Sequence, residues 1–382
     1  MTVKQGTSKN KGEISELYSF VYILGNGFLE LVDGNLQPLD NQIEFFKLIR
    51  SDKIECELNN AAGIVTIDSD GIRKVEDQSR IRTLCDNLLT LLQNSPKAID
   101  ENEKSVQSLL QLFETNVVSA KSQDKSDFCG CVKVNTVPGL HTLGFSVKSQ
   151  MGGAPTLINV NRLNAAMQYE VIQADGSPLT KAHQEKLLKL NSAKVKYWVK
   201  ARVQAVYDNG MKLRFNKPRG ECFNFNLKLI DMMAPEILGS VLLEHYRKES
   251  RQILTLESLV KQLCDSDHID RYPKLAEMAD TVEDVKTMLL YKLKRILCAF
   301  ATGATVTEKW DGQDKANGGI VIVMKDGNVV CLELFTRDAL MQYLISTTQF
   351  DGPSSKRHPY GSFYLEGDKL MFDLQAQVRF VE

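Results

Sequence analysis

Residues 127–160 read DFCGCVKVNTVPGLHTLGFSVKSQMGGAPTLINV, and this stretch decides the expected fold. Two β-rich runs, at 127–134 and 142–149, flank a turn that contains Pro138 and Gly139. Proline and glycine are typical turn residues, so the pattern predicts a hairpin or two neighbouring strands.

Apolar spacing around this stretch predicts a mixture of helices and strands. Helices are expected at 12–24, 78–94, 101–115, 160–169, 227–247, 254–264, 280–300 and 337–346. Strands are expected at 62–67, 194–206 and 211–215, in the GGIVIVM and VVCLELF runs after residue 317, and at the C-terminus. The expected class is mixed α+β, with a mixed sheet flanked by helices. A length of 382 residues suggests two regions, which we place at 1–250 and 251–382, with 302–312 as another position for the boundary.

Composition excludes several classes of protein. Hydrophobic residues make up 43% and charged residues 25% of the chain, so disorder throughout is excluded. The N-terminus lacks a signal-like apolar core and no run of about 18 apolar residues occurs, so we expect no membrane segment and a cytoplasmic location. Cys129 and Cys131 form the one close cysteine pair, and buried free thiols are the expected state.

The net charge of −1 conceals an uneven distribution. Residues 181–220 carry eleven Lys or Arg against two acids, with Tyr197, Trp198 and Phe215 among them. One interpretation is a groove that neutralises DNA phosphates, and the other is a solvated helix face followed by an edge strand that lysines protect. The candidate phosphate-binding residues are Lys194, Lys196, Lys200, Arg202, Lys212, Arg214, Lys217 and Arg219.

The 127–160 stretch also holds a candidate catalytic site. Ser146, Lys148 and Gln150 alternate, so a strand would point all three side chains to one face. If Asp127 opens the adjacent strand, its carboxylate lies near the Lys148 ammonium. Phosphodiester hydrolysis needs a metal held by carboxylates and a group that positions water. The alternative makes Asp127 a turn-capping residue and Lys148 a lysine that protects a sheet edge.

This constellation resembles that of the PD-(D/E)xK nucleases, with Ser146 in place of the usual second acid. The surrounding sequence is similar to the HpaII-type restriction endonucleases over essentially the whole chain. The matching blocks, in family order, are NKGEISELY at 10–18, KSDF at 125–128, LGFSVKSQMGGAPTLINV at 143–160, GGIVIVMKDGNVVC at 318–331, SSKRHPYG at 354–361 and LQAQVRF at 374–380.

The resemblance implies a PD-(D/E)xK-like core in 1–250 and a C-terminal α+β region in 251–382 that takes part in DNA recognition. It implies a Mg²⁺-dependent type II endonuclease that cleaves double-stranded DNA at a short palindrome, such as CCGG, and leaves 5′-phosphates. Asp127, the Val147 carbonyl and one glutamate would hold the metal. Glu13 is favoured for that glutamate, ahead of Glu170, and Glu16 is a further source on the first helix.

In this interpretation Lys148 stabilises the negative charge that develops on the phosphate, and Gln150 orients water or a phosphate oxygen. Ser146 is the residue that the family itself has in place of the second acid. Base recognition is assigned to Asn159, Asn161, Arg162, Lys356 and Arg357. A host would also carry a DNA methyltransferase for the same site, and action as a homodimer or as a sequentially nicking monomer is open. The competing functions are a catalytically silent DNA-binding protein with the nuclease fold and a metal hydrolase of small phosphates.

Overall fold

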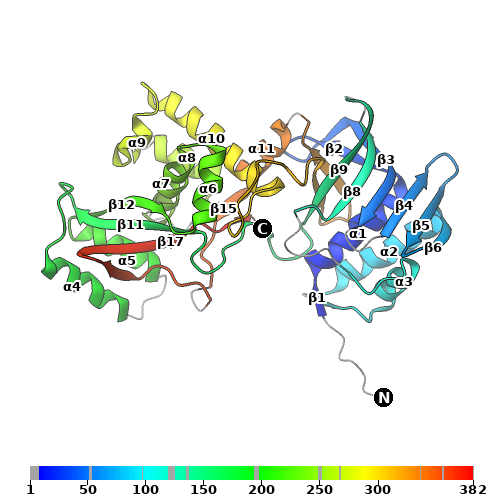
Figure 1. Cartoon of the computed structure of the whole chain (residues 1–382), viewed down its shortest axis with the longest axis horizontal. Coiled ribbons are helices and arrows are strands. Elements are labelled where there is room, and N and C mark those ends of the chain that lie inside the picture. The colour runs from blue at the N-terminus through cyan, green and yellow to red at the C-terminus, as the bar shows by residue number, and fades with distance from the viewer. Residues whose placement is uncertain are drawn as a thin grey trace, which may run out of the picture.

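The chain forms two lobes side by side in the computed structural model (Figure 1). The structure describes residues 8–50, 54–96, 98–118, 125–134, 137–192, 198–247, 252–265, 268–335, 337–354 and 357–381. Each lobe is built around a β-sheet, and the described residues form two hydrophobic cores, one of which extends from the second lobe onto the first sheet at residues 320, 322, 330 and 332. None of the described helices is long and apolar enough to cross a membrane.

The first lobe is built on a nine-stranded mixed sheet. In spatial order the strands are β2 (Phe28–Val32), β14 (Val329–Glu333), β13 (Gly319–Val323), β9 (Val137–Ser149), β8 (Phe128–Val134), β3 (Pro38–Arg50), β4 (Ile54–Asn59), β5 (Ile64–Ser69) and β6 (Ile72–Asp77). The pairs β13–β9 and β14–β2 are parallel, whereas the sequential neighbours run antiparallel. The hairpin expected from the quoted stretch is confirmed as β8 and β9.

Three helices cover this sheet: α1 (Lys11–Asn26), α2 (Gln78–Asn94) and α3 (Lys104–Leu112). A short pair of strands, β1 (Ser8–Asn10) and β7 (Ala98–Asp100), lies beside them. Helix α1 begins with a capping box formed by Asn10 and Glu13, and it ends where Gly27 adopts a φ of 82°. Its apolar side chains are almost completely buried, so this helix is a central part of the first core.

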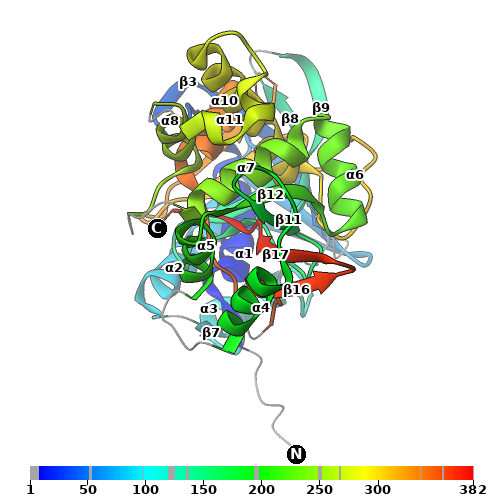
Figure 2. The same ribbon diagram turned by 90° about the vertical axis from the view of Figure 1, so that its left-hand side faces the viewer.

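The second lobe contains an antiparallel sheet in the order β12 (Met211–Pro218), β11 (Ala166–Gln173), β17 (Lys369–Gln375) and β16 (Phe363–Glu366). A smaller sheet joins β10 (Thr156–Ile158), β18 (Val378–Phe380) and β15 (Thr348–Phe350). The helices are α4 (Lys181–Lys189), α5 (Trp198–Asp208), α6 (Glu221–Ile230), α7 (Ala234–Arg247), α8 (Leu256–Asp265), α9 (Pro273–Ala276), α10 (Val282–Thr302) and α11 (Asp338–Thr347), with 3₁₀ turns η1 (Leu190–Ser192) and η2 (His268–Arg271). Figure 2 shows α7 lying across this sheet, where the Tyr169 hydroxyl donates to the Gly239 carbonyl.

Both large sheets combine strands from either side of residue 250. Strands β13 and β14 come late in the chain and complete the first lobe, and β17 pairs with β11 in the second. Hydrogen bonding therefore does not follow the division expected between 1–250 and 251–382.

Three expectations about local structure are wrong. The segment 160–169 is a turn followed by strand β11, whose residues are buried on both faces and so lack the alternation of a strand with one face in water. The described part of 194–206 belongs to helix α5, because Val199, Val203 and Val206 form a buried helical stripe. The region 227–247 is two helices, since Asp231 ends α6 and accepts a hydrogen bond from the Met233 amide. Strands β2, β3, β4 and β6 of the first sheet were not expected, nor were the three-residue strands β1, β7, β10 and β15.

Gly144 packs closely inside the hairpin, just before Ser146 and Lys148 on β9. A Cβ atom there would lie 2.2 Å from the Lys315 carbonyl oxygen and 2.8 Å from Ser126 Oγ. We therefore expect Gly144→Ala to lower the free energy of unfolding by about 1–3 kcal/mol through overpacking. Gly153→Ala is the matched control, because nothing lies within 4 Å of its added Cβ. Denaturant unfolding of both variants tests this, and equal stability would contradict the predicted clash.

Candidate active site

Two main-chain contacts fix Asp127 beside strand β9. Its amide donates to the Phe145 carbonyl oxygen at 2.8 Å, and its Oδ2 accepts from the Val147 amide at 2.6 Å. The last residue pair of the β8–β9 ladder is Phe128 with Phe145. Beyond it, the Asp127 carboxylate accepts the hydrogen bond that the Val147 amide would otherwise donate to a backbone carbonyl of β8. The carboxylate was expected near the Lys148 ammonium, and these contacts place it on the backbone of Val147, the residue before that lysine.

Lys148 points to the same side of the hairpin. Its ammonium donates to Ser146 Oγ at 3.0 Å and to the Val147 carbonyl oxygen at 3.2 Å. Lys148 pairs with Ile322 of β13 on one side, whereas the ladder with β8 ends at Phe145 and leaves the other side of β9 without a strand partner at this position. The lysine therefore lies where β9 extends past the start of β8, beside the Asp127 carboxylate that bonds the Val147 amide.

These side chains open onto a cavity of about 520 Å³ between the lobes. From the first lobe Glu16, Lys125, Asp127, Ser146 and Lys148 line it. The opposite wall comes from the second lobe and consists of residues 156–161 and residues 300, 301 and 304–308. The second wall combines hydroxyl and amide groups with apolar side chains and the Glu308 carboxylate, and the two lysines of the first wall suit a phosphate-bearing substrate.

Lys125 is a second lysine in this cavity that the sequence interpretation did not single out. Its Nζ donates to the Phe300 carbonyl oxygen of α10 at 2.9 Å, so it connects the two walls. Burial, together with the nearby Lys148 ammonium, lowers the pKa of Lys125 to about 8 against the opposing effect of Asp127. The signal in the sequence was its position two residues before Asp127, because alternate residues of an extended segment face the same way.

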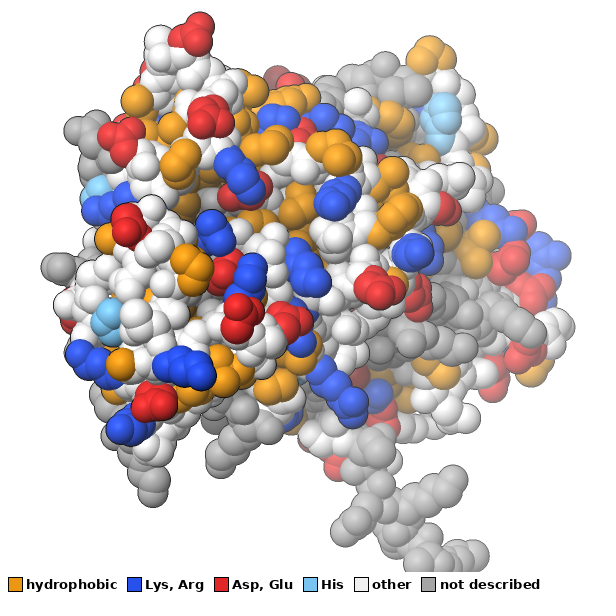
Figure 3. All heavy atoms as spheres, turned by 60° about the vertical axis from the view of Figure 1, so that its left-hand side comes forward, with side chains coloured by type: hydrophobic (Ala, Val, Ile, Leu, Met, Phe, Trp, Pro, Cys, Tyr) orange, Lys and Arg blue, Asp and Glu red, His pale blue; other side chains and the backbone are white. Residues whose placement is uncertain are grey.

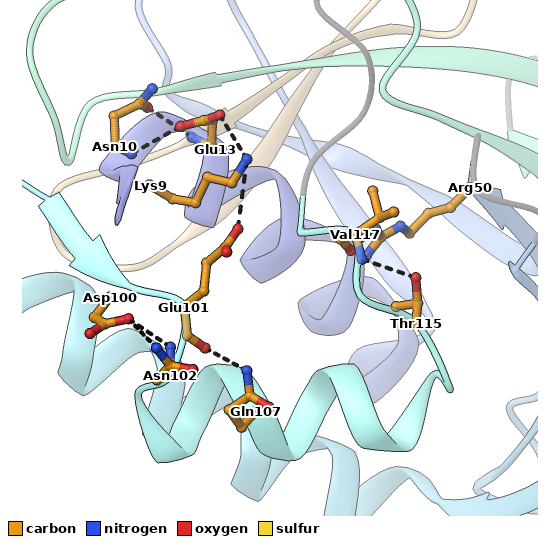
Figure 4. Close-up of polar contacts among 10 residues, drawn as sticks. All are labelled: Lys9, Asn10, Glu13, Arg50, Asp100, Glu101, Asn102, Gln107, Thr115 and Val117. Atoms are coloured by element: carbon orange, nitrogen blue, oxygen red, sulfur yellow. Dashed lines mark hydrogen bonds and ion pairs between the residues drawn. The ribbon is translucent and has the colours of Figure 1, made fainter. Parts of the chain in front are cut away.

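Of the three candidate glutamates, only Glu16 lines the cavity. Glu13 takes part in the start of α1: its Oε2 accepts from the Asn10 amide at 2.9 Å, and its Oε1 lies 3.5 Å from Lys9 Nζ. Lys9 in turn lies 3.7 Å from Glu101, as Figure 4 shows. Glu13 is thereby committed to helix capping, so the structure favours Glu16 over the expected Glu13.

Glu170 lies on β11 in the second lobe and does not line the cavity. Its carboxylate pairs with Arg214 at 2.7 Å and with Lys369 at 3.4 Å. Burial raises the pKa of Glu170, but the hydrogen bond and charge of Arg214 outweigh it and bring the pKa below its ordinary value. These ion pairs hold β11, β12 and β17 together rather than serving the Asp127 site.

Gln150 lies beyond Lys148 in a neighbouring cavity of about 790 Å³. The backbone amide of Gln150 donates to the Val323 carbonyl oxygen at 2.8 Å, and Tyr343 lines the same cavity. Lys148 lines both cavities, whereas Gln150 lines only the second. The structure therefore separates Gln150 from Asp127, although the alternation along β9 was expected to bring them together.

The oxygen donors near Asp127 fit a small hard cation. Within the described ranges no three His, Cys, Asp or Glu side chains form a metal-binding group. Magnesium, however, retains several waters and is often held by one or two carboxylates together with substrate phosphates. The Asp127 carboxylate, the Val147 carbonyl beside Lys148, and Glu16 across the cavity are donors of that kind.

Several basic residues of 181–220 have structural partners. Arg202 is buried, stacks on Trp198 and donates to the carbonyls of Leu190, Asn191 and Gly361. Arg219 pairs with Asp373. Lys212 donates to the Ala174 carbonyl, Lys200 lies on α5, and Lys194 and Lys196 are outside the described residues.

The buried position of Arg202 contradicts its expected contact with DNA. Lys217 remains exposed on β12. Figure 3 shows lysine and arginine side chains interspersed with acidic ones across the face of the second lobe, not an unbroken basic surface.

Two of the expected recognition residues, Asn159 and Asn161, line the cavity opposite Asp127. They follow strand β10 in extended chain, not at a helix start as expected. Arg162 has a φ of 50° and forms the turn that leads into β11. Arg357 lies in the loop before β16, where its amide donates to the Ser354 carbonyl, and Lys356 is outside the described residues.

A model of the HpaII restriction endonuclease family matches residues 10–380. The chain belongs to this family. A type II restriction enzyme, HpaII of Haemophilus parainfluenzae, is 26% identical over 98% of the chain and 99% of its own length. No solved structure matches the chain. The HpaII-type resemblance drawn from the six sequence blocks is thus confirmed, and the chain is a type II restriction endonuclease by family.

Glu13 and Glu16 can be separated by experiment because they occupy different environments on one helix. We expect Glu13→Ala to lower the free energy of unfolding by about 0.5–2 kcal/mol, as loss of a cap does, while DNA cleavage persists. Glu16→Ala should leave the unfolding midpoint close to that of the wild type and reduce cleavage. Denaturant unfolding and a DNA nicking assay on both variants test this. Loss of cleavage in Glu13→Ala at unchanged stability would restore the assignment made from sequence.

Proposed function

We propose that this enzyme hydrolyses duplex DNA phosphodiesters at a short palindrome in a Mg²⁺-dependent reaction and leaves 5′-phosphates. The observation that carries the proposal is the joint placement of Asp127, Ser146 and Lys148 in the cavity between the lobes. We also propose that β8, β9 and α1 are the core of a PD-(D/E)xK-like fold. The family's CCGG site is the first candidate for the target.

The metal site would consist of Asp127, Glu16 and the Val147 carbonyl oxygen. Bound Mg²⁺ would neutralise charge on the scissile phosphate and lower the pKa of water. Lys148 contributes a fixed positive charge where negative charge develops, and Lys125 contributes a second one on the same wall. A bond forms between the water oxygen and phosphorus, the bond from phosphorus to the 3′ oxygen breaks, and the phosphate stays on the 5′ end.

Ser146 supports this reading over a catalytically silent DNA-binding protein. A serine in place of the second acid was the reason for considering loss of catalysis. Its hydroxyl instead accepts from the Lys148 ammonium at 3.0 Å and so orients the lysine. The missing carboxylate has a counterpart in Glu16, which reaches the cavity from α1.

DNA would enter between the lobes, with Asn159 and Asn161 facing the base edges from the second lobe and the exposed lysines near 181–220 contacting phosphates outside the cavity. Cleavage of both strands of a palindrome by a homodimer, a cytoplasmic location of the enzyme, and protection of the host site by a DNA methyltransferase belong to the same proposal. A small-phosphate hydrolase fits less well, because the chain belongs to a family of restriction endonucleases.

Cleavage of mixed-sequence duplex DNA with Mg²⁺ tests the proposal. We expect discrete fragments with the wild type and a loss of at least about 100-fold in rate for Lys148→Ala and for Asp127→Asn. Lys133→Ala on β8 is the matched control, since its side chain is exposed and outside the cavity. Sequence-specific binding without cleavage in Mg²⁺ or Mn²⁺ would establish the silent DNA-binding protein instead.

The basic segment makes a separate prediction about salt. We expect the combined change of Lys194, Lys196 and Lys200 to alanine to weaken DNA binding at low salt. The slope of log affinity against log salt should flatten by about 0.9 for each phosphate contact that is lost. Filter binding or fluorescence anisotropy in EDTA measures both quantities. The control replaces three lysines on other helices, Lys261, Lys274 and Lys286, and an equal effect in both triple variants would refute a localised phosphate contact.

A further inference from the structure

The cavity wall opposite Asp127 is a loop that follows helix α10. Thr305, Thr307 and Glu308 of this loop line the cavity, and Thr307 and Glu308 are exposed. The loop is short and irregular, yet several buried contacts hold it in one position. A loop that is fixed and faces a substrate cavity has the properties of a recognition element.

Asn226 on α6 holds the loop from beneath. Its side chain is fully buried, and its Nδ2 donates to the carbonyls of Thr305 at 2.8 Å and Glu308 at 2.7 Å. Its Oδ1 accepts from the Trp310 amide at 2.8 Å. Both amide hydrogens and the carbonyl oxygen of this asparagine are therefore used on the backbone of one loop.

The end of the same connection is fixed to the catalytic hairpin. The Thr302 carbonyl accepts from the amides of Lys315 at 3.0 Å and Ala316 at 2.9 Å. Asn317 Oδ1 accepts from the Gly144 amide at 2.7 Å, close to Ser146 and Lys148 on β9. These bonds set the spacing between the loop and the catalytic groups.

Glu308 is an acidic side chain of this loop that lines the cavity proposed to bind DNA. No ion pair within the described residues includes its carboxylate, and it faces a cavity proposed to receive a polyanion. Repulsion from DNA phosphates would oppose binding unless the carboxylate meets a hydrogen-bond donor. At the edge of a base pair in the major groove, the cytosine N4 amino group is a donor that glutamate accepts from.

We propose that the 305–308 loop reads the DNA sequence and that the Glu308 carboxylate accepts a hydrogen bond from the N4 amino group of a cytosine in the target site. Asn226 is a positioning residue that holds Glu308 at a fixed place relative to Lys148. This inference rests on the proposed DNA cleavage and adds a specificity-determining residue to it.

The first experiment maps the cleaved ends of a random-sequence duplex library by sequencing, with Mg²⁺ and the intact enzyme. We expect the wild type to select one site and Glu308→Ala and Glu308→Gln to relax selection at one cytosine by about ten-fold, the usual size of one base contact. Glu221→Gln on α6 is the matched control, because this acid is exposed and does not line the cavity.

The second experiment replaces each cytosine of the mapped site with 2-pyrimidinone, which lacks the 4-amino group. The wild type should bind one substituted duplex about ten-fold more weakly in EDTA, and Glu308→Ala should bind both duplexes equally. Asn226→Ser should give the same relaxed selection as Glu308→Ala.

The possible outcomes test DNA cleavage by the enzyme separately from base reading by Glu308. If the wild type cleaves nothing in the library, DNA cleavage itself fails. If it cleaves and the Glu308 variants select the same site as strictly, the reading role fails. Uniform loss of cleavage in the Glu308 variants on every sequence, with unchanged site preference, would assign Glu308 to metal binding or catalysis and also overturn the inference.

Discussion

The hydrogen bond from the Val147 amide to Asp127 Oδ2 is the contact on which the site depends. It forms where strand β8 begins and where β9 approaches its end, so the paired strands deliver a carboxylate to the segment that carries Lys148. A carboxylate that accepts a backbone N–H retains lone pairs for a cation, and the neighbouring Val147 carbonyl supplies a second oxygen. The serine, the lysine and the glutamate of α1 are then arranged around a donor set that the strands hold in place.

Much of this arrangement followed from the sequence because it is local. Asp127 and Lys148 are 21 positions apart, one directly before β8 and the other on β9, so turn chemistry and alternation were sufficient to bring these segments together. The choice between Glu13 and Glu16 was also accessible, since an asparagine three residues before a glutamate is the mark of a capping box. That signal was present in NKGE, but the sequence interpretation assigned Glu13 to the metal instead.

The second wall could not be derived in the same way. Its members come from residues 156–161 and 300–308, and only the packing of α10 against the strands brings them to the cavity. Patterns along the chain carry no information about such distant contacts. Strand β11 was mistaken for a helix for a related reason: when both faces of a strand are buried, the alternation that distinguishes it is lost. Within the basic segment 181–220, the expected DNA contact of Arg202 was wrong. Charge in a sequence does not reveal which guanidinium groups stack on aromatic rings and donate to internal carbonyls, as that of Arg202 does.

The late entry of β13 and β14 into the first sheet has a consequence for how the polypeptide acquires its structure. Until residues 319–333 have left the ribosome, β9 has β8 on one side and an open edge on the other. That edge is the segment from Phe145 to Ser149, so the catalytic strand itself would offer unpaired amides and carbonyls to other chains. A fragment that ends near residue 250 would keep this edge permanently. The strand that carries Ser146 and Lys148 is therefore covered on this side only when the last quarter of the chain adds β13 and β14 to the sheet.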